Sequence, residues 1–517
     1  MSLRKALVSL RKALVSLRKA LVSLRKALVS LRVALSTVVL LALAPAIAAA
    51  AQPPVALSVT GATAGPPVPA GFVGLATEYW DVEKEVGTNP AKPDTAFEQT
   101  ARNLAPYGGL SFRIGGDSTD WTWFPVPGMA QPRWVRWTMT PTWAAVTSRL
   151  IGDLHAHLIA GINMEADSAA IARAEVQEIK ATIGASAPVT YELGNEPELY
   201  SHFPFYHNAA GVAVLGRPQG FSYADIAAQW SHLARALPRV RLAGPGYSGP
   251  RALPYVGQFL DASGRLSLLT VHTYPLKSPR CGAGEHLQES ELFDSQSLAG
   301  LAGALRGWTA LAHAHGVSLR VDEMNAVTCG GQPGFTNTFG PALWALNVLP
   351  LYAADGVGGV NLQTRPYTAQ NLIQTDHTPA GWRVSVQPEY YGLLAFAQLT
   401  PPGSRILRLP ALGQGLYAWA VRTPSGQTHV VLTNVGTSAQ SFTLRIAGAH
   451  GAASVRALRA ASGGLQASAG VSLAGQTVSP ISGRLVGRAL EQTVRPAGGA
   501  YDISVAPASA EIVTVNR

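Results

Sequence analysis

No acidic side chain occurs before Glu78, and lysine is scarce after residue 51, where only four lysines occur. The formal charge of +10 reflects 40 basic residues against 30 acidic residues. Nine of the basic residues lie within residues 1–51, so the rest of the chain carries 31 basic and 30 acidic residues. Proteins that bind nucleic acid need a basic face to neutralise phosphates. We therefore expect no nucleic-acid partner.

Cysteine is also rare, with only Cys281 and Cys329 in 517 residues. The sequence has no Cys-x-x-Cys pair and no His-x-x-x-His pair, the spacings typical of zinc sites. We expect neither a metal nor another cofactor. An even cysteine count in an oxidising compartment is compatible with a disulfide between Cys281 and Cys329.

Residues 1–51 have the pattern of a secretory leader. Residues 2–29 are four copies of Ser-Leu-Arg-Lys-Ala-Leu-Val, and an uncharged run over 33–51 follows and ends in small residues. A basic segment, an apolar segment and small residues predict a signal peptide and a secreted or periplasmic protein that contacts the membrane only transiently. An uncleaved membrane anchor and a basic amphipathic helix on an anionic membrane are the alternatives.

The body of the chain predicts an α/β fold, a (β/α)₈ barrel over residues 68–400. Apolar or β-branched runs alternate there with helix-like segments, as in consecutive βα units. An open doubly wound sheet is the rival, but no glycine-rich phosphate loop follows the first run. The predicted strands are 71–79, 109–116, 158–164, 189–196, 240–247, 266–275, 317–325 and 356–364.

Beyond residue 400 the pattern changes to short alternating segments separated by Gly, Pro, Ser and Asn. Alternation of this kind is typical of an antiparallel β-sandwich. We therefore expect a C-terminal sandwich over residues 401–517. The strand-like segment 54–60 precedes the barrel, and we expect it to join that sandwich.

Two carboxylates, Glu196 and Glu323, close the fourth and seventh predicted strands. The C-terminal ends of barrel strands carry the catalytic groups in enzymes of this fold. Strands four and seven bring the two side chains to the same mouth of the barrel. A pair of opposed carboxyl groups is what glycoside hydrolysis requires, one as a proton donor and one as an ionised group at the anomeric carbon.

Five motifs in order resemble glycoside hydrolase family 79, the β-glucuronidase and heparanase family. The resemblance covers roughly residues 54–517 and includes the trailing sandwich. The motifs are Gly71-Phe72-Val73-Gly74-Leu75-Ala76-Thr77-Glu78, Arg113-Ile114-Gly115-Gly116-Asp117-Ser118-Thr119-Asp120, Asn195-Glu196-Pro197, His272-Thr273-Tyr274-Pro275 and Asp322-Glu323.

The resemblance implies a retaining β-glycosidase with Glu196 as general acid/base and Glu323 as nucleophile. Retention predicts carboxyl groups about 5–5.5 Å apart, against ~6.5–9.5 Å for inversion. The resemblance also implies that Asn195 binds the sugar 2-hydroxyl, that Tyr274 hydrogen-bonds the nucleophile, and that Glu78 and Asp117 bind other hydroxyls of the ring.

Several of these residues also have simpler interpretations. Glu78 and Asp117 could instead pair with Arg113, and Tyr274 could be a wall residue. Tyr367, after the eighth strand, is a candidate sugar contact, as are Asn361 and Gln363. Trp121 and Trp123 could stack on a sugar or only pack their loop.

The sequence departs from the family at the loop that binds the uronic carboxylate. The resemblance implies a tyrosine and glycine amides there, whereas this chain has Thr328-Cys329-Gly330-Gly331. The amides of Gly330 and Gly331 could bind an anion, with the Thr328 hydroxyl and Lys277 as further donors. We expect a β-glucuronide or glucuronate-capped carbohydrate as substrate. The alternatives are a 4-O-methylglucuronide, a neutral hexoside or pentoside, or a carbohydrate-binding barrel without activity.

Overall fold

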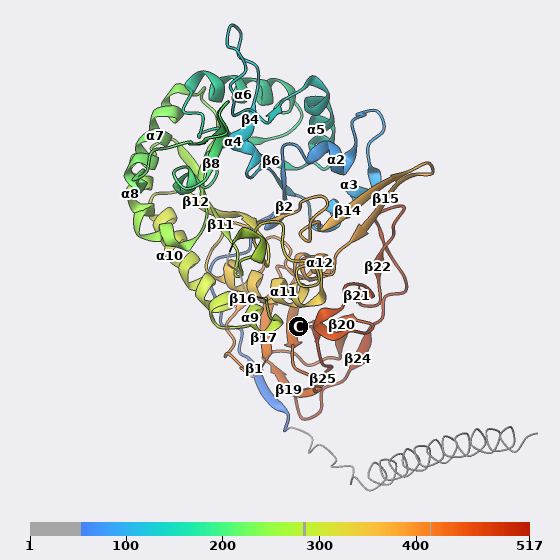
Figure 1. Cartoon of the computed structure of the whole chain (residues 1–517). Coiled ribbons are helices and arrows are strands. Elements are labelled where there is room, and N and C mark those ends of the chain that lie inside the picture. Colours follow the sequence, from blue (N-terminus) through green and yellow to red (C-terminus); the bar gives the residue numbers. More distant parts are fainter. Residues whose placement is uncertain (1–52, 283–285, 414, 517) are drawn as a thin grey trace, which may run out of the picture. The chain divides into compact units, whose positions relative to one another are not determined.

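A closed barrel of eight parallel strands forms the centre of the fold (Figure 1). The structure is a computed structural model that describes residues 53–282, 286–413 and 415–516. The strands follow chain order around the barrel, and each predicted run overlaps one of them, so the predicted (β/α)₈ fold is confirmed. The barrel strands are β2 (Val73–Glu78), β3 (Ser111–Gly115), β6 (His157–Ile162), β7 (Val189–Leu193), β10 (Leu242–Tyr247), β11 (Leu266–Thr273), β12 (Ser318–Met324) and β13 (Val360–Gln363).

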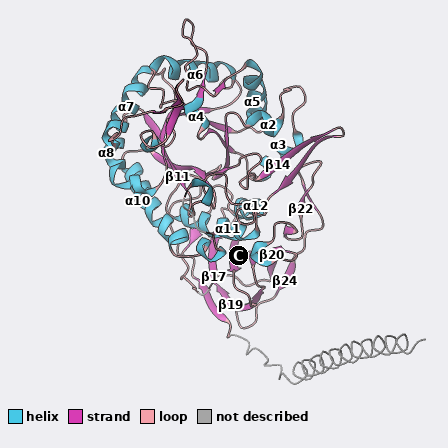
Figure 2. Ribbon diagram, in the orientation of Figure 1, coloured by secondary structure: helices cyan, strands magenta, loops and turns pink. Residues whose placement is uncertain are grey.

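Helices surround the barrel (Figure 2). Strands β2, β3 and β10 are buried at every residue, because the barrel interior covers one face and helices cover the other. The helix starts follow from the sequence: the side chains of Thr140, Ser168 and Ser222 accept hydrogen bonds from the first turns of their helices. The helices are α2 (Val82–Val86), α3 (Thr95–Asn103), α4 (Ser118–Trp121), α5 (Pro141–Asp153), α6 (Ala169–Thr182), α7 (Tyr223–Ala236), α8 (Val256–Ala262), α9 (Glu289–Leu292), α10 (Leu301–Ala314), α11 (Phe339–Ala354) and α12 (Glu389–Leu399).

Three of the βα connections contain small sheets of their own. The connection after β3 holds the parallel pair β4 (Thr122–Trp123) and β5 (Trp137–Thr138). The connection after β7 holds the hairpin β8 (Pro204–His207) and β9 (Ala213–Leu215). The connection after β13 holds the hairpin β14 (Ile373–Thr378) and β15 (Gly381–Val386). Each of these insertions follows the C-terminal end of a barrel strand, the end that carries catalytic groups in this fold.

The C-terminal segment forms two larger sheets that share a second apolar core, and a short antiparallel pair of strands, β22 (Thr477–Val478) and β23 (Leu485–Val486). In the smaller sheet, β1 (Val55–Val59) pairs in parallel with β19 (Gln440–Ile446), so the strand before the barrel belongs to this sheet. Strand β25 (Tyr501–Val505) completes it. The larger sheet contains β16 (Arg405–Leu407), β17 (Leu416–Arg422), β18 (Thr428–Asn434), β26 (Ser509–Val515), β20 (Ala453–Ala460), β21 (Val471–Leu473) and β24 (Gln492–Val494).

Helices α11 and α12 connect the barrel with the larger sheet. Helix α11 packs against β16 and β17, and α12 packs against β20 and β21. Nearly every residue of α11 is therefore buried, and the Thr433 hydroxyl donates to Asn347 Oδ1 over 3.3 Å across this contact. The predicted leader, residues 1–51, lies outside the described residues. Within the described part of the chain, no helix has both the length and the apolar character needed to cross a bilayer.

Candidate active site

Glu196 and Glu323 lie close together at the C-terminal mouth of the barrel. Glu323 is part of β12, whereas Glu196 follows β7 in a left-handed backbone conformation with φ of 48°. The Glu196 amide donates to Gly246 O over 2.8 Å, which fixes this turn. One carboxylate oxygen of each glutamate lies within 4.8 Å of the other. That separation suits a retaining pair, since an inverting pair needs ~6.5–9.5 Å to admit a water molecule.

Glu323 is held as a carboxylate by two donors. The Tyr274 hydroxyl donates to Oε1 over 2.6 Å, and Arg113 Nη1 donates to Oε2 over 2.7 Å. Burial raises the pKa of Glu323, but His272, Arg113 and the Tyr274 hydrogen bond outweigh it, so the pKa is lowered overall. An ionised, oriented carboxylate is the form that a nucleophile requires.

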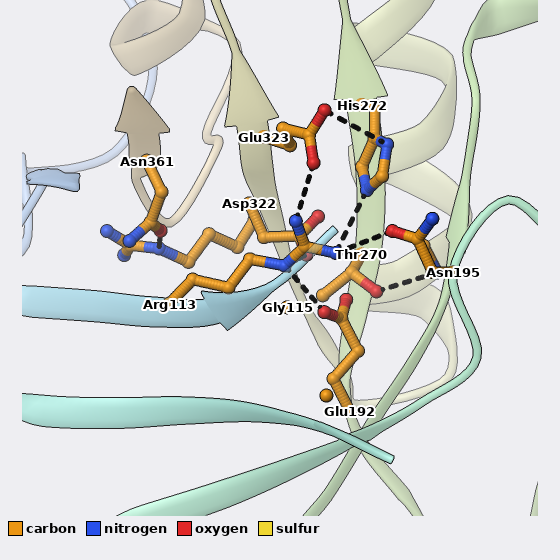
Figure 3. Close-up of polar contacts among 12 residues, drawn as sticks. Arg113, Gly115, Glu192, Asn195, Thr270, His272, Asp322, Glu323 and Asn361 are labelled. Atoms are coloured by element: carbon orange, nitrogen blue, oxygen red, sulfur yellow. Dashed lines mark hydrogen bonds and ion pairs between the residues drawn. The ribbon is translucent and has the colours of Figure 1, made fainter. Parts of the chain in front are cut away.

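His272, near the end of β11, lies beside Glu323 (Figure 3) and also contacts Glu196. Its Nδ1 is 2.8 Å from Glu196 Oε1 and 3.8 Å from Glu323 Oε1. Burial lowers the pKa of His272, and the charge of Glu323 and the hydrogen bond to Glu196 raise it to about 10. Its Nε2 lies 3.3 Å from Arg113 Nη2. In the protonated ring, and in the neutral ring whose Nε2 accepts from Arg113, Nδ1 carries a hydrogen directed at Glu196.

Arg113, on β3, is a fully buried cation that lies between Glu323 and Glu192 (Figure 3). Its Nε lies 2.7 Å from Glu192 and 2.9 Å from Asp322, and its Nη1 pairs with Glu323. Burial and the neighbouring Glu192 raise the pKa of Asp322, whereas Arg113 overcomes burial and lowers the pKa of Glu192. One proton on Asp322 therefore leaves a buried network with a small net charge. A metal between Glu196, His272 and Glu323 would lie beside this guanidinium, which opposes a cation.

Asn195 presents an amide beside Glu196. Arg113 Nη2 donates to Asn195 Oδ1 over 3.0 Å, which fixes the orientation of the side chain. Its N–H₂ group makes no hydrogen bond to the residues that the structure describes and keeps access to solvent. A substrate hydroxyl next to the anomeric carbon is a suitable acceptor for it.

Glu78 and Asp117 occupy the side of the mouth formed by the first and second barrel strands. Glu78 Oε2 accepts the Ser118 amide over 2.8 Å, and Gln363 Nε2 lies 3.5 Å from Glu78 Oε1. Burial, followed by the charge of Asp117, raises the pKa of Glu78 to about 8, so this carboxyl carries a proton at neutral pH. Asp117 is exposed and faces Arg365, with 3.9 Å between Oδ2 and Nη1. Neither Glu78 nor Asp117 pairs with Arg113, so the simpler of the two interpretations of these residues does not hold.

The loop after β12 is closed on itself and on its neighbours. A disulfide joins Cys281 and Cys329. The Thr328 hydroxyl accepts the Ser278 amide over 3.0 Å, and the Gly331 amide donates to Thr328 O over 2.9 Å, so it is already paired. Gly330 has φ of 78°, and its carbonyl accepts the Ala369 amide over 3.0 Å.

Among the described residues, the remaining candidates form no hydrogen bond or ion pair with Glu196 or Glu323. Lys277 is exposed, and the Tyr367 side chain is 88% exposed. Asn361 is fully buried and donates to Leu75 O inside the barrel. Trp123 is buried in a separate aromatic cluster. Trp121 is half-buried, with the guanidinium of Arg136 3.6 Å above its ring.

Sequence reasoning gave no role to His272 and did not name Arg365. His272 lies in the His-Thr-Tyr-Pro string at the end of the sixth predicted strand. Its position at the C-terminal end of a barrel strand could have indicated a role in the site. Arg365 lies two residues after the last residue of β13. A basic residue so close to the C-terminal end of a barrel strand could likewise have indicated a role in the site.

Comparisons with known proteins show a shared fold. No family model matches the chain, and no curated protein matches it. A 4-O-α-L-rhamnosyl-β-D-glucuronidase from Fusarium oxysporum 12S is similar in structure, with a TM-score of 0.65 and 18% identity over 89% of this chain and 100% of that one. The GH51 arabinofuranosidase of Xanthomonas axonopodis pv. citri has a TM-score of 0.60 and 15% identity over 89% and 99%. The GH30 xylanase C of Talaromyces cellulolyticus has a TM-score of 0.52 and 12% identity over 89% and 100%. The chain therefore has a barrel fold that glycoside hydrolases use.

Proposed function

We propose that the protein is a retaining β-glycosidase that hydrolyses β-glucuronides. The observation that carries this proposal is the pair of carboxylate oxygens within 4.8 Å, one of which belongs to a glutamate held ionised by Tyr274 and Arg113. The similar structure of a glucuronidase supports the choice of sugar.

The first step forms a glycosyl-enzyme ester. Glu323 attacks the anomeric carbon, the glycosidic C–O bond breaks, and the leaving oxygen takes a proton from Glu196. The hydrogen bond from His272 occupies Glu196 Oε1 and leaves Oε2 for the leaving group. The positive charge that develops on the sugar is stabilised by the Glu323 carboxylate, which Arg113 and Tyr274 hold in place before the substrate arrives.

The second step hydrolyses the ester. Glu196 now accepts a proton from water, and the hydroxide oxygen attacks the anomeric carbon as the bond to Glu323 breaks. Two inversions return the sugar with its original configuration. The same residue acts as acid and then as base, so the enzyme ends the cycle in its starting protonation state.

The other groups at the mouth are suited to orient the sugar ring. The free amide of Asn195 lies beside Glu196 and suits the 2-hydroxyl. Glu78, which carries a proton at neutral pH, can donate to a hydroxyl, while Asp117 accepts from one. Each of these contacts fixes the sugar ring relative to Glu323. Together they place the anomeric carbon in position for attack by Glu323.

We also propose that the protein is exported through the predicted leader. Cleavage should leave a mature chain that begins near Ala51. N-terminal sequencing of protein from the culture medium or periplasm tests this proposal, and an intact Met1 on that material would contradict it.

The activity is tested with a panel of aryl β-glycosides that includes the glucuronide, the 4-O-methylglucuronide, the glucoside and the xyloside. We expect the highest kcat/KM for the glucuronide. Glu323→Ala and Glu323→Gly should lose turnover by several orders of magnitude, and azide should restore it with an α-glycosyl azide as product. Glu491→Ala, an exposed glutamate of the C-terminal segment, is the matched control. Turnover in the Glu323 variants without azide would contradict the mechanism, and no turnover of any glycoside by the wild type would favour a binding protein.

A further inference from the structure

Arg365 is a cation at the barrel mouth whose donors are unused. Its Nη1 lies 3.9 Å from Asp117 Oδ2, beyond hydrogen-bond reach, and its side chain is 30% exposed. Its guanidinium makes no hydrogen bond to any residue that the structure describes. A guanidinium offers five N–H donors in a fixed plane and binds carboxylates in a bidentate manner. Arg365 therefore has the capacity to bind an anion that the protein itself does not supply.

The charges around Arg365 leave part of its positive charge available. Four carboxyl groups lie close enough to interact with it electrostatically: Glu78, Asp117, Asp81 and Glu323. Glu78 carries a proton at neutral pH. Asp81 already pairs with Lys84 over 2.6 Å, and Glu323 pairs with Arg113 over 2.7 Å. Asp117 is thus the one of these four that directly faces Arg365.

The backbone that carries Arg365 is fixed by the neighbouring loop. The Thr368 hydroxyl donates to Arg365 O over 2.8 Å, and the Ala369 amide donates to Gly330 O over 3.0 Å. A Cβ atom on Gly330 would lie 3.2 Å from Thr368, so the two loops approach closely because residue 330 is a glycine. The loop after β12, expected to bind a carboxylate through its amides, here supports the loop that holds Arg365.

The position of Arg365 around the barrel corresponds to the side of a bound pyranose ring that carries C5. In such a ring, C2 and C5 are opposite each other, and both C2 and the ring oxygen flank the anomeric carbon. The Asn195 amide, after β7, is placed for the hydroxyl on C2. Strand β13 lies four strands from β7 in the closed barrel of eight, on the opposite side. The substituent on C5 is therefore directed toward the end of β13, where Arg365 lies.

We propose that Arg365 binds the C5 carboxylate of a uronic acid and so determines the preference for uronides over neutral glycosides. This inference rests on the proposed β-glucuronidase function and adds the residue that selects the sugar. Lys277 is exposed, and the Gly331 amide is already bonded to Thr328 O, so neither has the free, partly buried donors that Arg365 has.

The test compares Arg365→Gln and Arg365→Lys with the wild type on two substrates, 4-nitrophenyl β-D-glucuronide and its methyl ester. The ester keeps the shape of the acid and removes its charge. For Arg365→Gln we expect kcat/KM on the acid to fall about 10- to 100-fold, the range for a hydrogen bond to a charged group. Activity on the ester should change little, and Arg365→Lys should recover part of the loss on the acid.

Lys277→Gln is the matched control, and we expect it to keep the wild-type ratio of acid to ester activity. An unchanged ratio in Arg365→Gln would overturn the inference. So would equal losses on acid and ester, because they would assign Arg365 to the placement of Asp117 and Glu78. If the wild type does not prefer the glucuronide in the aryl panel, the proposed function is contradicted before any variant is made. If the wild type prefers the glucuronide and Arg365→Gln keeps that preference, only the inference about Arg365 is contradicted.

Discussion

His272 Nδ1 lies 2.8 Å from Glu196 Oε1, so a ring from the sixth barrel strand orients the carboxyl group that follows the fourth. The backbone of Glu196 is fixed by its amide hydrogen bond to Gly246 O, but its side chain is 23% exposed and needs a separate restraint. The hydrogen bond to a fully buried ring supplies that restraint. It also leaves the second oxygen of Glu196 free of this hydrogen bond and able to face a glycosidic oxygen.

His272→Ala should therefore impair proton donation more than nucleophilic attack. We expect kcat on glycosides with poor leaving groups to fall about 10- to 100-fold, a part of the ~10²–10⁴-fold effect of a general acid. Substrates with dinitrophenolate leaving groups need no proton and should lose much less. A plot of log kcat against leaving-group pKa measures this difference as a steeper slope.

His315→Ala provides the control, because His315 lies on the surface at the end of α10 and contacts Asp261 instead of the site. Its slope should equal that of the wild type. Equal losses for good and poor leaving groups in His272→Ala would show that the ring stabilises the site without acting through Glu196.

Tyr274→Phe should change the pH dependence through Glu323. Burial raises the pKa of Glu323, and His272, Arg113 and the Tyr274 hydrogen bond lower it below the usual range. Glu323 acts only when ionised, so activity is present above its pKa and lost as pH falls through it. Removal of the hydroxyl, 2.6 Å from Oε1, raises that pKa. We expect the acidic limb of kcat/KM to move to higher pH by about one unit, and kcat at neutral pH to fall about tenfold.

Tyr367→Phe is the matched control, since its hydroxyl lies on a side chain that is 88% exposed. Its pH profile should overlay that of the wild type. A reduced kcat in Tyr274→Phe with an unmoved acidic limb would show that the tyrosine contacts the sugar and does not set the charge of Glu323.

The positions of Glu196 and Glu323 at the barrel mouth could be predicted from the sequence, because the strand pattern and the spacing of units fix which strand ends share one face. Helix caps such as Ser222 are local features and could be read in the same way. The separation of the carboxyl groups could be expected from the family resemblance. Each of these features depends on a single segment of the chain or on the order of the segments, and both can be read from the sequence.

The network around Arg113 could not be predicted to the same depth. Arg113, Glu192 and Asp322 come from three different strands, and their contacts depend on strand register and on which side chains point into the barrel. The same holds for Arg365, whose position depends on backbone contacts between two loops. Tyr367 has φ of 62° and turns toward solvent, which a pattern of residues does not indicate.

Arg113→Met should destabilise the fold, because it leaves buried carboxylates without their cation. We expect the free energy of unfolding at pH 7 to fall by about 3–5 kcal/mol. Arg113 lowers the pKa of Glu192 against the effect of burial, and together with His272 it lowers the pKa of Glu323. Its stabilising effect is therefore present above the ordinary pKa of these carboxyl groups and is lost as pH falls through the lowered values. The difference between variant and wild type should therefore shrink below about pH 4.5.

Chemical unfolding at pH 7 and at pH 4 measures this difference. Arg149→Met is the control, since Arg149 forms an exposed ion pair with Asp153 within one helix and its loss should leave stability almost unchanged. A constant difference between the two pH values would show that Arg113 stabilises the barrel by packing and not through the charges of the carboxylates.

Replacement of both cysteines by serine should lower stability while leaving activity at 25 °C close to that of the wild type. The disulfide between Cys281 and Cys329 spans 48 residues, and its loss should reduce the free energy of unfolding by about 2–4 kcal/mol. Activity is expected to persist because three hydrogen bonds still join these loops. They run from the Ser278 amide to the Thr328 hydroxyl, from the Ser278 hydroxyl to Gly331 O and from the Thr328 amide to Leu276 O. Thermal unfolding of the wild type with reductant should match the double variant, and reductant should not affect the variant, since the chain has no other cysteine. A loss of glucuronide activity in the folded variant would instead show that the disulfide is needed to hold the loop under Arg365.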